Sequence, residues 1–226
     1  EDRRLDREIL SEIFTIGLPA LGTTFVSCFG YIAFARMVSG MGTTIFAAHS
    51  IAITAEQIVY IPGYGLRVAT STLVGNALGE KDIRKLKATE RVSILITLLI
   101  MVVNGIGLYL FAYPFMRLFT NSVNAARIGS EMLRLVSFSE PFFGLMIVLE
   151  GISYGMGRTK HVFACEAVSM WGIRIFGTFL CVNVFGLGLK AVWLCMIADN
   201  ICKAILLYIF RPKHVEENAD DRGALR

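Results

Sequence analysis

Charged residues are scarce in this sequence and unevenly placed. They make up 18% of the 226 residues, while hydrophobic residues make up 55%. A soluble domain has about 25% charged and about 45–50% apolar residues. The charges crowd into residues 1–12, 80–91 and 211–226 and leave long stretches between them almost uncharged. This composition argues against an ordinary soluble domain and indicates a membrane protein.

Several chemical patterns are also missing. The five cysteines lie in apolar stretches without a C-x-x-C pair, which predicts buried free thiols. The three histidines are scattered, and no Ser-His-Asp, metal-ligand or phosphate-loop pattern occurs, so we expect neither an enzyme nor a bound cofactor or metal. No basic stripe indicates nucleic-acid binding, despite the net charge of +4. The opening EDRRLDRE is not a signal peptide and lacks an initiating Met, which suggests a fragment.

Long apolar segments define the predicted fold. A bilayer core needs roughly 20 consecutive apolar residues per helix, and residues 92–116 meet that length without one charge. We therefore predict an all-α integral membrane protein, a bundle of six transmembrane helices. The six predicted spans are residues 13–35, 45–76, 92–116, 130–156, 161–186 and 189–210.

Both ends of the chain lie outside these spans. Residues 1–12 place Leu5 and Ile9 at helical spacing among charges, which predicts either an amphipathic cytoplasmic lead in the membrane interface or a solvated terminus. Residues 211–226 predict a charged cytoplasmic tail.

The second predicted span is too long to be straight. A helix over residues 45–76 would extend about 48 Å at 1.5 Å per residue, against a bilayer core of roughly 30 Å. Pro62 removes a backbone donor and Gly63 loosens the same turn. We therefore predict a helix kink there.

Lys and Arg residues are shared unequally between the two sides of the predicted bundle. Fourteen lie on the side of the chain start, and four lie on the other side. By the positive-inside rule the first side is cytoplasmic. Both termini are then expected in the cytoplasm, which requires an even number of spans and agrees with six.

Ionisable residues recur inside the predicted spans, where each is costly unless it faces a partner or a cavity. Nine such residues in six spans suggest a water-filled interior. They are Glu56, Arg67, Arg134, Glu140, Glu150, Glu166, Arg174, Asp199 and Lys203.

Some of these residues are predicted to line a transport path. Glu56, Tyr60 and Arg67 share one helix face, although Arg67 could instead snorkel to the cytoplasmic surface. Asp199 and Lys203 are spaced i, i+4 with the acid first, the favourable order for a helical ion pair. A structural role and a transport role both stay open for that pair.

The fourth predicted span holds two further candidates for the path. Glu140 precedes Pro141, which breaks the helical hydrogen-bond ladder and frees a carbonyl. Glu140 could therefore hold a cation or a proton, or serve as a structural cap. Glu150 lies among glycines that permit close helix approach. In the next span, Glu166 and Arg174 are not adjacent on a helix and are expected at the membrane interface.

Two stretches carry a resemblance to a known family. Residues 61–82 (IPGYGLRVATSTLVGNALGEKD) combine a Pro-Gly kink, a run of small residues and a V-G-x-x-L-G helix end. Residues 140–160 (EPFFGLMIVLEGISYGMGRTK) end in a Gly-rich run before Thr159 and Lys160. In this order and spacing they resemble the multidrug and toxin extrusion (MATE) transporters, and the stretches LPALG, FARMVSGMGT, AAHSIA and SMWGIRI fit the second half of such a protein.

The resemblance is to the C-terminal six-helix half, and most closely to the DinF-like branch. Many sodium-type and eukaryotic members carry a glutamate in the first helix of this half, whereas residues 13–35 contain no acidic residue. In the DinF-like branch the proton-coupling aspartate lies in the other half. Tyr154 stands where the family often has Arg, so no substrate contact is assigned to it.

The resemblance implies one lobe of a twelve-helix transporter whose two lobes rock about a central cavity. It implies a secondary active antiporter of the cell membrane that exports cationic or amphipathic small molecules in exchange for H⁺ or Na⁺. The partner of this chain would be an N-terminal six-helix half or a second copy of the chain. Two alternatives stay open: a flippase lobe for lipid-linked oligosaccharides, which a strongly cationic cavity would favour, and a non-transporting membrane scaffold or assembly subunit.

Overall fold

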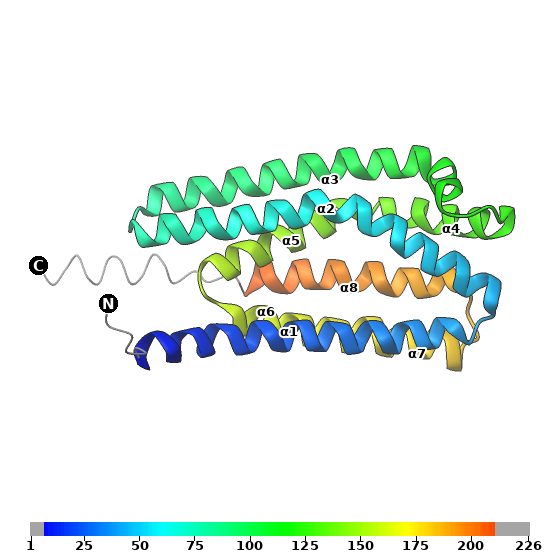
Figure 1. Ribbon diagram of the computed structural model, residues 1–226, viewed down its shortest axis with the longest axis horizontal. Coiled ribbons are helices and arrows are strands. Elements are labelled where there is room, and N and C mark those ends of the chain that lie inside the picture. Colours follow the sequence, from blue (N-terminus) through cyan, green and yellow to red (C-terminus); the bar gives the residue numbers. More distant parts are fainter. Residues whose placement is uncertain (1–6, 211–226) are drawn as a thin grey trace, which may run out of the picture.

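Long helices joined by short turns run alongside one another through the molecule (Figure 1). The computed structural model describes residues 7–210, which contain helices and turns and no strand. The predicted tail (211–226) and the first part of the predicted lead (1–6) lie outside the described residues.

Three long helices come first in the chain: α1 (Arg7–Ser39), α2 (Thr43–Gly79) and α3 (Ile83–Phe119). α4 (Val123–Ser137) and α5 (Glu140–Gly155) follow. The next stretch is helical throughout and consists of α6 (Thr159–Ser169), the π-helix η1 (Met170–Ile175), α7 (Phe176–Phe179) and the π-helix η2 (Leu180–Val184). The last helix is α8 (Leu189–Ile209).

Five of these helical stretches are long and apolar enough to cross a membrane, and the bent pair α4–α5 makes up to six. The predicted all-α membrane fold is confirmed. The two π-helical segments were not predicted, because a π turn has no clear signature in an apolar sequence.

The connection between α2 and α3 is shorter than predicted. It consists of residues 80–82, where Lys81 adopts a left-handed conformation with φ 57°. The side chain of Asp82 then caps α3 by accepting a hydrogen bond from the backbone nitrogen of Lys85 at 2.9 Å. The charged residues 83–91 therefore form the first turns of α3, whose length of about 55 Å lets it project beyond a bilayer core.

α2 is a continuous helix that contains Pro62 and bends near its middle (Figure 1). Gly63, next to the proline, is buried against α3. A Cβ at this position would lie 2.6 Å from Cε of Met101, the flexible end of an α3 side chain, which would have to move.

The fourth predicted span is not one helix. α4 and α5 are inclined at 61° to each other across the break at residues 138–139. Pro141 lies in the first turn of α5, where a missing N–H interrupts no bond within that helix. The chain therefore changes direction just before the proline.

The helices form two groups that α5 and α8 join (Figure 1). In one group α2 packs against α3, α4 and α5, and in the other α1 packs along α6. α8 contacts both α5 and α6. Buried apolar residues gather in two clusters, one around Trp193, Met116 and Leu133 and one around Met101 and Ile147.

Candidate functional site

A cavity of about 390 Å³ lies where the two helix groups meet. α1 and α2 supply most of its wall, and α5, η1 and α8 each contribute at least one residue. The polar and aromatic residues on which its chemistry depends are Tyr31, Phe34, His49, Glu56, Gln57, Tyr60, Tyr64, Phe143, Arg174 and Asn200.

Glu56 is the acid of this cavity. It is buried, and Tyr60, one helical turn further along α2, donates its phenolic hydroxyl to Oε1 of the carboxylate. The Tyr60 ring stacks on Phe143 of α5 with the ring centroids 3.7 Å apart. Phe143 also meets Tyr64 edge-on, at 6.1 Å between centroids. Two residues predicted for a transport path, Glu56 and Tyr60, thus lie together in a wall lined with aromatic rings.

Arg174 brings the opposite charge to the cavity. Its guanidinium lies 5.5 Å from the ring centroid of Tyr31 and 5.8 Å from that of Phe34, both on α1. Its Nη2 is 2.8 Å from Oδ2 of Asp199 and 3.3 Å from Oδ1 of Asn200. The arginine is therefore neutralised by α8. It is buried rather than interfacial, because its partners come from a different span.

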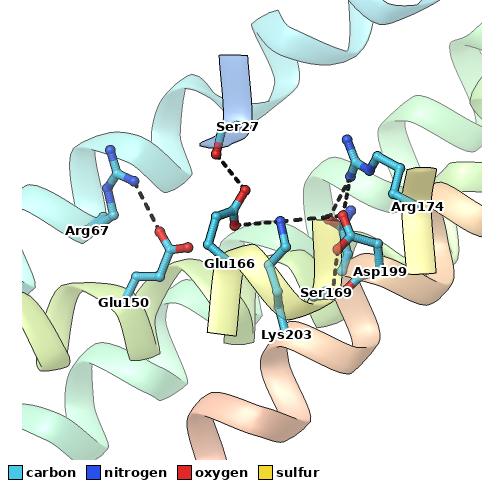
Figure 2. Close-up of polar contacts among 9 residues, drawn as sticks. Ser27, Arg67, Glu150, Glu166, Ser169, Arg174, Asp199 and Lys203 are labelled. Carbon is cyan, nitrogen blue, oxygen red and sulfur yellow. Dashed lines mark hydrogen bonds and ion pairs between the residues drawn. The ribbon is translucent and has the colours of Figure 1, made fainter. Parts of the chain in front are cut away.

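Lys203 joins Arg174 and Asp199 to a second acid (Figure 2). Its Nζ lies 2.7 Å from Oε2 of Glu166 and 3.4 Å from Oδ2 of Asp199. The predicted i, i+4 pair is thus present, although the contact to Glu166 is the shorter of the two. Ser27 of α1 donates to Glu166 at 2.5 Å, and Ser169 of α6 donates to Asp199 at 2.5 Å. Two acids and two cations balance in a buried network that ties α1, α6, η1 and α8 together.

Arg67 and Glu150 form a separate ion pair between α2 and α5. Their Nη1 and Oε2 atoms are 3.1 Å apart (Figure 2). A Cβ at Gly151 would lie 2.7 Å from the carbonyl oxygen of Arg67, so the neighbouring glycine permits the close approach that the pair needs. The sequence did not predict this pair, because the two residues lie on different helices and helical spacing relates only residues of one helix.

Glu140 lies outside the cavity wall. Its side chain is fully buried at the start of α5 and neither of its carboxylate oxygens has a hydrogen-bond partner. Of the remaining candidates, Pro62 and Gly63 lie at the middle of α2, and Pro141 follows Glu140 in the first turn of α5.

Several cavity residues were not found from the sequence. Tyr31, Tyr64 and Phe143 read as ordinary apolar helix residues, and His49 is a lone histidine that accepts a hydrogen bond from Nε1 of Trp193 at 3.2 Å. Within residues 7–210, no group of three or more His, Cys, Asp and Glu residues is placed to hold a metal ion.

Known proteins resemble this chain in sequence over most of its length. The MatE family model matches residues 19–180. The probable multidrug resistance protein NorM of Thermotoga maritima is 30% identical over 201 residues, which cover 88% of this chain and 43% of the relative. The protein of the same name from Photorhabdus laumondii is 28% identical over 204 residues, which cover 88% and 45%. The chain spans less than half the length of these curated relatives.

Solved transporter structures share the fold. A MOP superfamily transporter from Pyrococcus furiosus superposes with a TM-score of 0.84 at 22% identity, over 92% of this chain and 47% of that chain. The Vibrio cholerae MATE transporter VcmN in its bent form superposes with a TM-score of 0.82 at 16% identity, over the same shares. Since the family model covers most of a helical bundle that superposes on known transporters, this chain belongs to the MatE family of membrane transporters.

Proposed function

We propose that this chain forms one six-span lobe of a multidrug exporter in the cell membrane. Its MatE membership and the names of its relatives support drug export. The share of those relatives that it covers supports one lobe of a two-lobe protein. The order of its motifs supports the C-terminal lobe, of the DinF-like branch, with an N-terminal six-helix half as the partner.

The exporter is a secondary active antiporter driven by H⁺ or Na⁺ rather than an enzyme. Acids buried in the helix bundle can take up and release a small cation as the lobes rock. The excess of Lys and Arg on one side of the bundle supports cytoplasmic termini.

The cavity around Glu56 is the observation that carries this proposal. A carboxylate beside the faces and edges of Tyr60, Tyr64 and Phe143 suits an organic cation, because both the acid and the aromatic quadrupoles attract positive charge. Flat amphipathic cations also gain from the apolar contact.

The two alternatives are less well supported. A flippase for lipid-linked oligosaccharides would need a strongly cationic cavity, whereas the arginine of this cavity is paired with Asp199. A scaffold subunit would not need a buried acid such as Glu56 in the wall of a cavity. We therefore favour export of organic cations.

Ethidium efflux from cells that express the complete gene tests the proposal. Glu56→Gln removes the negative charge and keeps the shape, so we expect efflux to fall by about tenfold, equivalent to about 1.4 kcal/mol of lost binding. Glu131→Gln is the matched control, since Glu131 pairs with Lys190 on the surface at 3.1 Å. Equal efflux by the wild type and Glu56→Gln would contradict the role of this cavity.

A further inference from the structure

Two cysteines face each other beside the turn that joins the last two spans. Cys181 belongs to η2 and Cys195 to α8, and their Sγ atoms are 3.7 Å apart. Both are free thiols and both are half-buried. They are 14 positions apart in the sequence, so the contact joins the end of one helical stretch to the first turns of the next.

The turn between them holds the backbone on both sides of this contact. The backbone nitrogen of Leu187 donates to the carbonyl oxygen of Cys181 at 2.7 Å, and that of Phe185 donates to the carbonyl oxygen of Leu180 at 2.9 Å. Gly186, between the two donors, has φ 61°, a left-handed conformation that glycine adopts without strain. The two sulfur atoms are therefore positioned by a hydrogen-bonded turn.

α7 leaves room for the sulfur of Cys195. Gly177 lies one helical turn before Cys181, and a Cβ at this glycine would lie 3.2 Å from Sγ of Cys195. The Cys195 sulfur thus lies against a residue without a side chain. A disulfide bond is about 2.05 Å long, so the two sulfur atoms must approach by about 1.7 Å. Rotation of the two short side chains about their Cα–Cβ bonds can supply this movement.

The other three cysteines are placed differently. Sγ of Cys165 lies 3.5 Å from Nε2 of His161 on the same helix. Cys28 is exposed on α1, and Cys202 is half-buried on α8. In the part of the chain that the structure describes, Cys181 and Cys195 are the two cysteines whose sulfur atoms are in contact.

The pair lies near the end of the bundle that is away from the start of α1 (Figure 1). Both cysteines are within two helical turns of the connecting turn. This end carries the smaller share of Lys and Arg residues, which predicts that it faces out of the cytoplasm. Disulfides form and persist in such oxidising surroundings.

We propose that Cys181 and Cys195 are a redox-sensitive pair that a small disulfide oxidises to an intramolecular disulfide bond between η2 and α8. One cysteine, as the thiolate, attacks the small disulfide and releases a first small thiol. The second cysteine then displaces the other small thiol from the mixed disulfide. The pair loses two electrons and two protons, and the two released thiols carry them away.

This crosslink would stabilise the hairpin without restraining a movement of the whole lobe. It closes a loop of residues 181–195 and so restricts the unfolded chain more than the folded one. Its two ends lie on neighbouring helices of the same bundle, so it fixes no helix of a partner. The inference stands apart from drug export, because it concerns two thiols of this chain alone.

Peptide mapping by mass spectrometry tests the pair in the purified full chain in lipid nanodiscs. The reduced protein is treated with dithiodipyridine, a small aromatic disulfide, and is then digested. We expect a peptide pair joined through Cys181 and Cys195, lighter by two hydrogens than the separate peptides, and a thiopyridine adduct on the exposed Cys28. The melting temperature of the oxidised protein should be higher than that of the reduced protein and should return on addition of dithiothreitol.

Single cysteine variants supply the controls. Cys181→Ala and Cys195→Ala should each lose the joined peptides and the reversible rise in melting temperature. Cys28→Ala, which removes a cysteine outside the pair, should keep both. The mapping of the wild-type protein gives an answer even where a variant does not fold.

Two outcomes would overturn the assignment, both in a sample whose Cys28 has reacted. One is a separate thiopyridine adduct on each of Cys181 and Cys195, which would show that the sulfur atoms do not reach each other. The other is that both cysteines stay free thiols, which would place the pair beyond the reach of a small disulfide. Equal melting temperatures of the joined and the reduced protein would contradict the stabilisation.

Discussion

Arg174 and Asp199 form an ion pair of 2.8 Å in which the side chains are 5% and 0% exposed. Their helices, η1 and α8, belong to different spans. Lys203 approaches the same aspartate at 3.4 Å. The carboxylate of Asp199 therefore offsets part of the positive charge of both Arg174 and Lys203.

Replacing Asp199 should destabilise the bundle strongly. Asp199→Asn keeps the size of the side chain but leaves Arg174 with an uncompensated buried charge, and removing one partner of such a pair costs about 3–5 kcal/mol. Thermal unfolding in detergent measures the loss. The exposed pair Glu131–Lys190 provides the control, because Glu131→Gln should cost less than about 1 kcal/mol. Similar melting temperatures for the two variants would contradict a network that holds α8 in place.

Glycine at the α2–α5 contact should be required for packing. A Cβ at Gly155 would lie 2.5 Å from the carbonyl oxygen of Ser71 and 2.8 Å from Cβ of Val74. Gly155→Ala must push α2 and α5 apart, at a cost of about 1–3 kcal/mol. Gly107→Ala is the matched control, since nothing lies within 4 Å of a Cβ there. A melting temperature of Gly155→Ala at or above that of the control would show that the helices are not so closely packed.

The fold could be predicted from the sequence to a large extent, because the bilayer imposes a length and an apolarity that single segments must satisfy. The predicted span 13–35 lies within α1, and the predicted span 189–210 extends one residue beyond the end of α8. The break between α4 and α5 was less visible. Pro141 marks the first turn after the break rather than the break itself.

The candidate site could be predicted only as far as single helices allow. Glu56 and Tyr60 are one turn apart, so their shared face follows from helical geometry. The partners Arg67 and Glu150 are 83 positions apart in the sequence, and no periodicity brings them together. The same holds for Arg174, whose burial depends on α8.

The orientation of the lobe can be tested by cysteine labelling. On a background without the five native cysteines, Ser122→Cys should react with an impermeant maleimide in intact cells, and Lys85→Cys should react only after permeabilisation. The reason is that residue 85 lies on the side rich in Lys and Arg, which is expected in the cytoplasm. Both positions are exposed: Ser122 caps the start of α4, and Lys85 lies in the first turn of α3. The reverse pattern would invert the topology.

One face of α2 is more polar than a lipid-facing helix should be. Ser50, Thr54, Gln57, Tyr64 and Thr72 are exposed and recur at helical spacing. The two threonines return their hydroxyls to carbonyls one turn back. The side-chain amide of Gln57 carries two donors and an acceptor oxygen, which lipid cannot satisfy. This face should therefore be covered by protein or border a water-filled space.

The last prediction is that this chain alone does not export drugs. A rocking-lobe transporter binds its substrate between two walls, and one lobe provides one wall. The polar face of α2 and the partly exposed Arg67 should then be covered by a partner rather than by lipid. This partner is either an N-terminal half or a second copy in the same membrane orientation. We expect a dimer in nanodiscs by mass photometry and no ion-driven ethidium transport in proteoliposomes. A homodimer would still lack an acid in its first predicted span, since residues 13–35 contain none. Proton- or sodium-dependent uptake by the purified chain would contradict this, because Glu140, Glu150 or Asp199 would then have to couple the ion within one lobe.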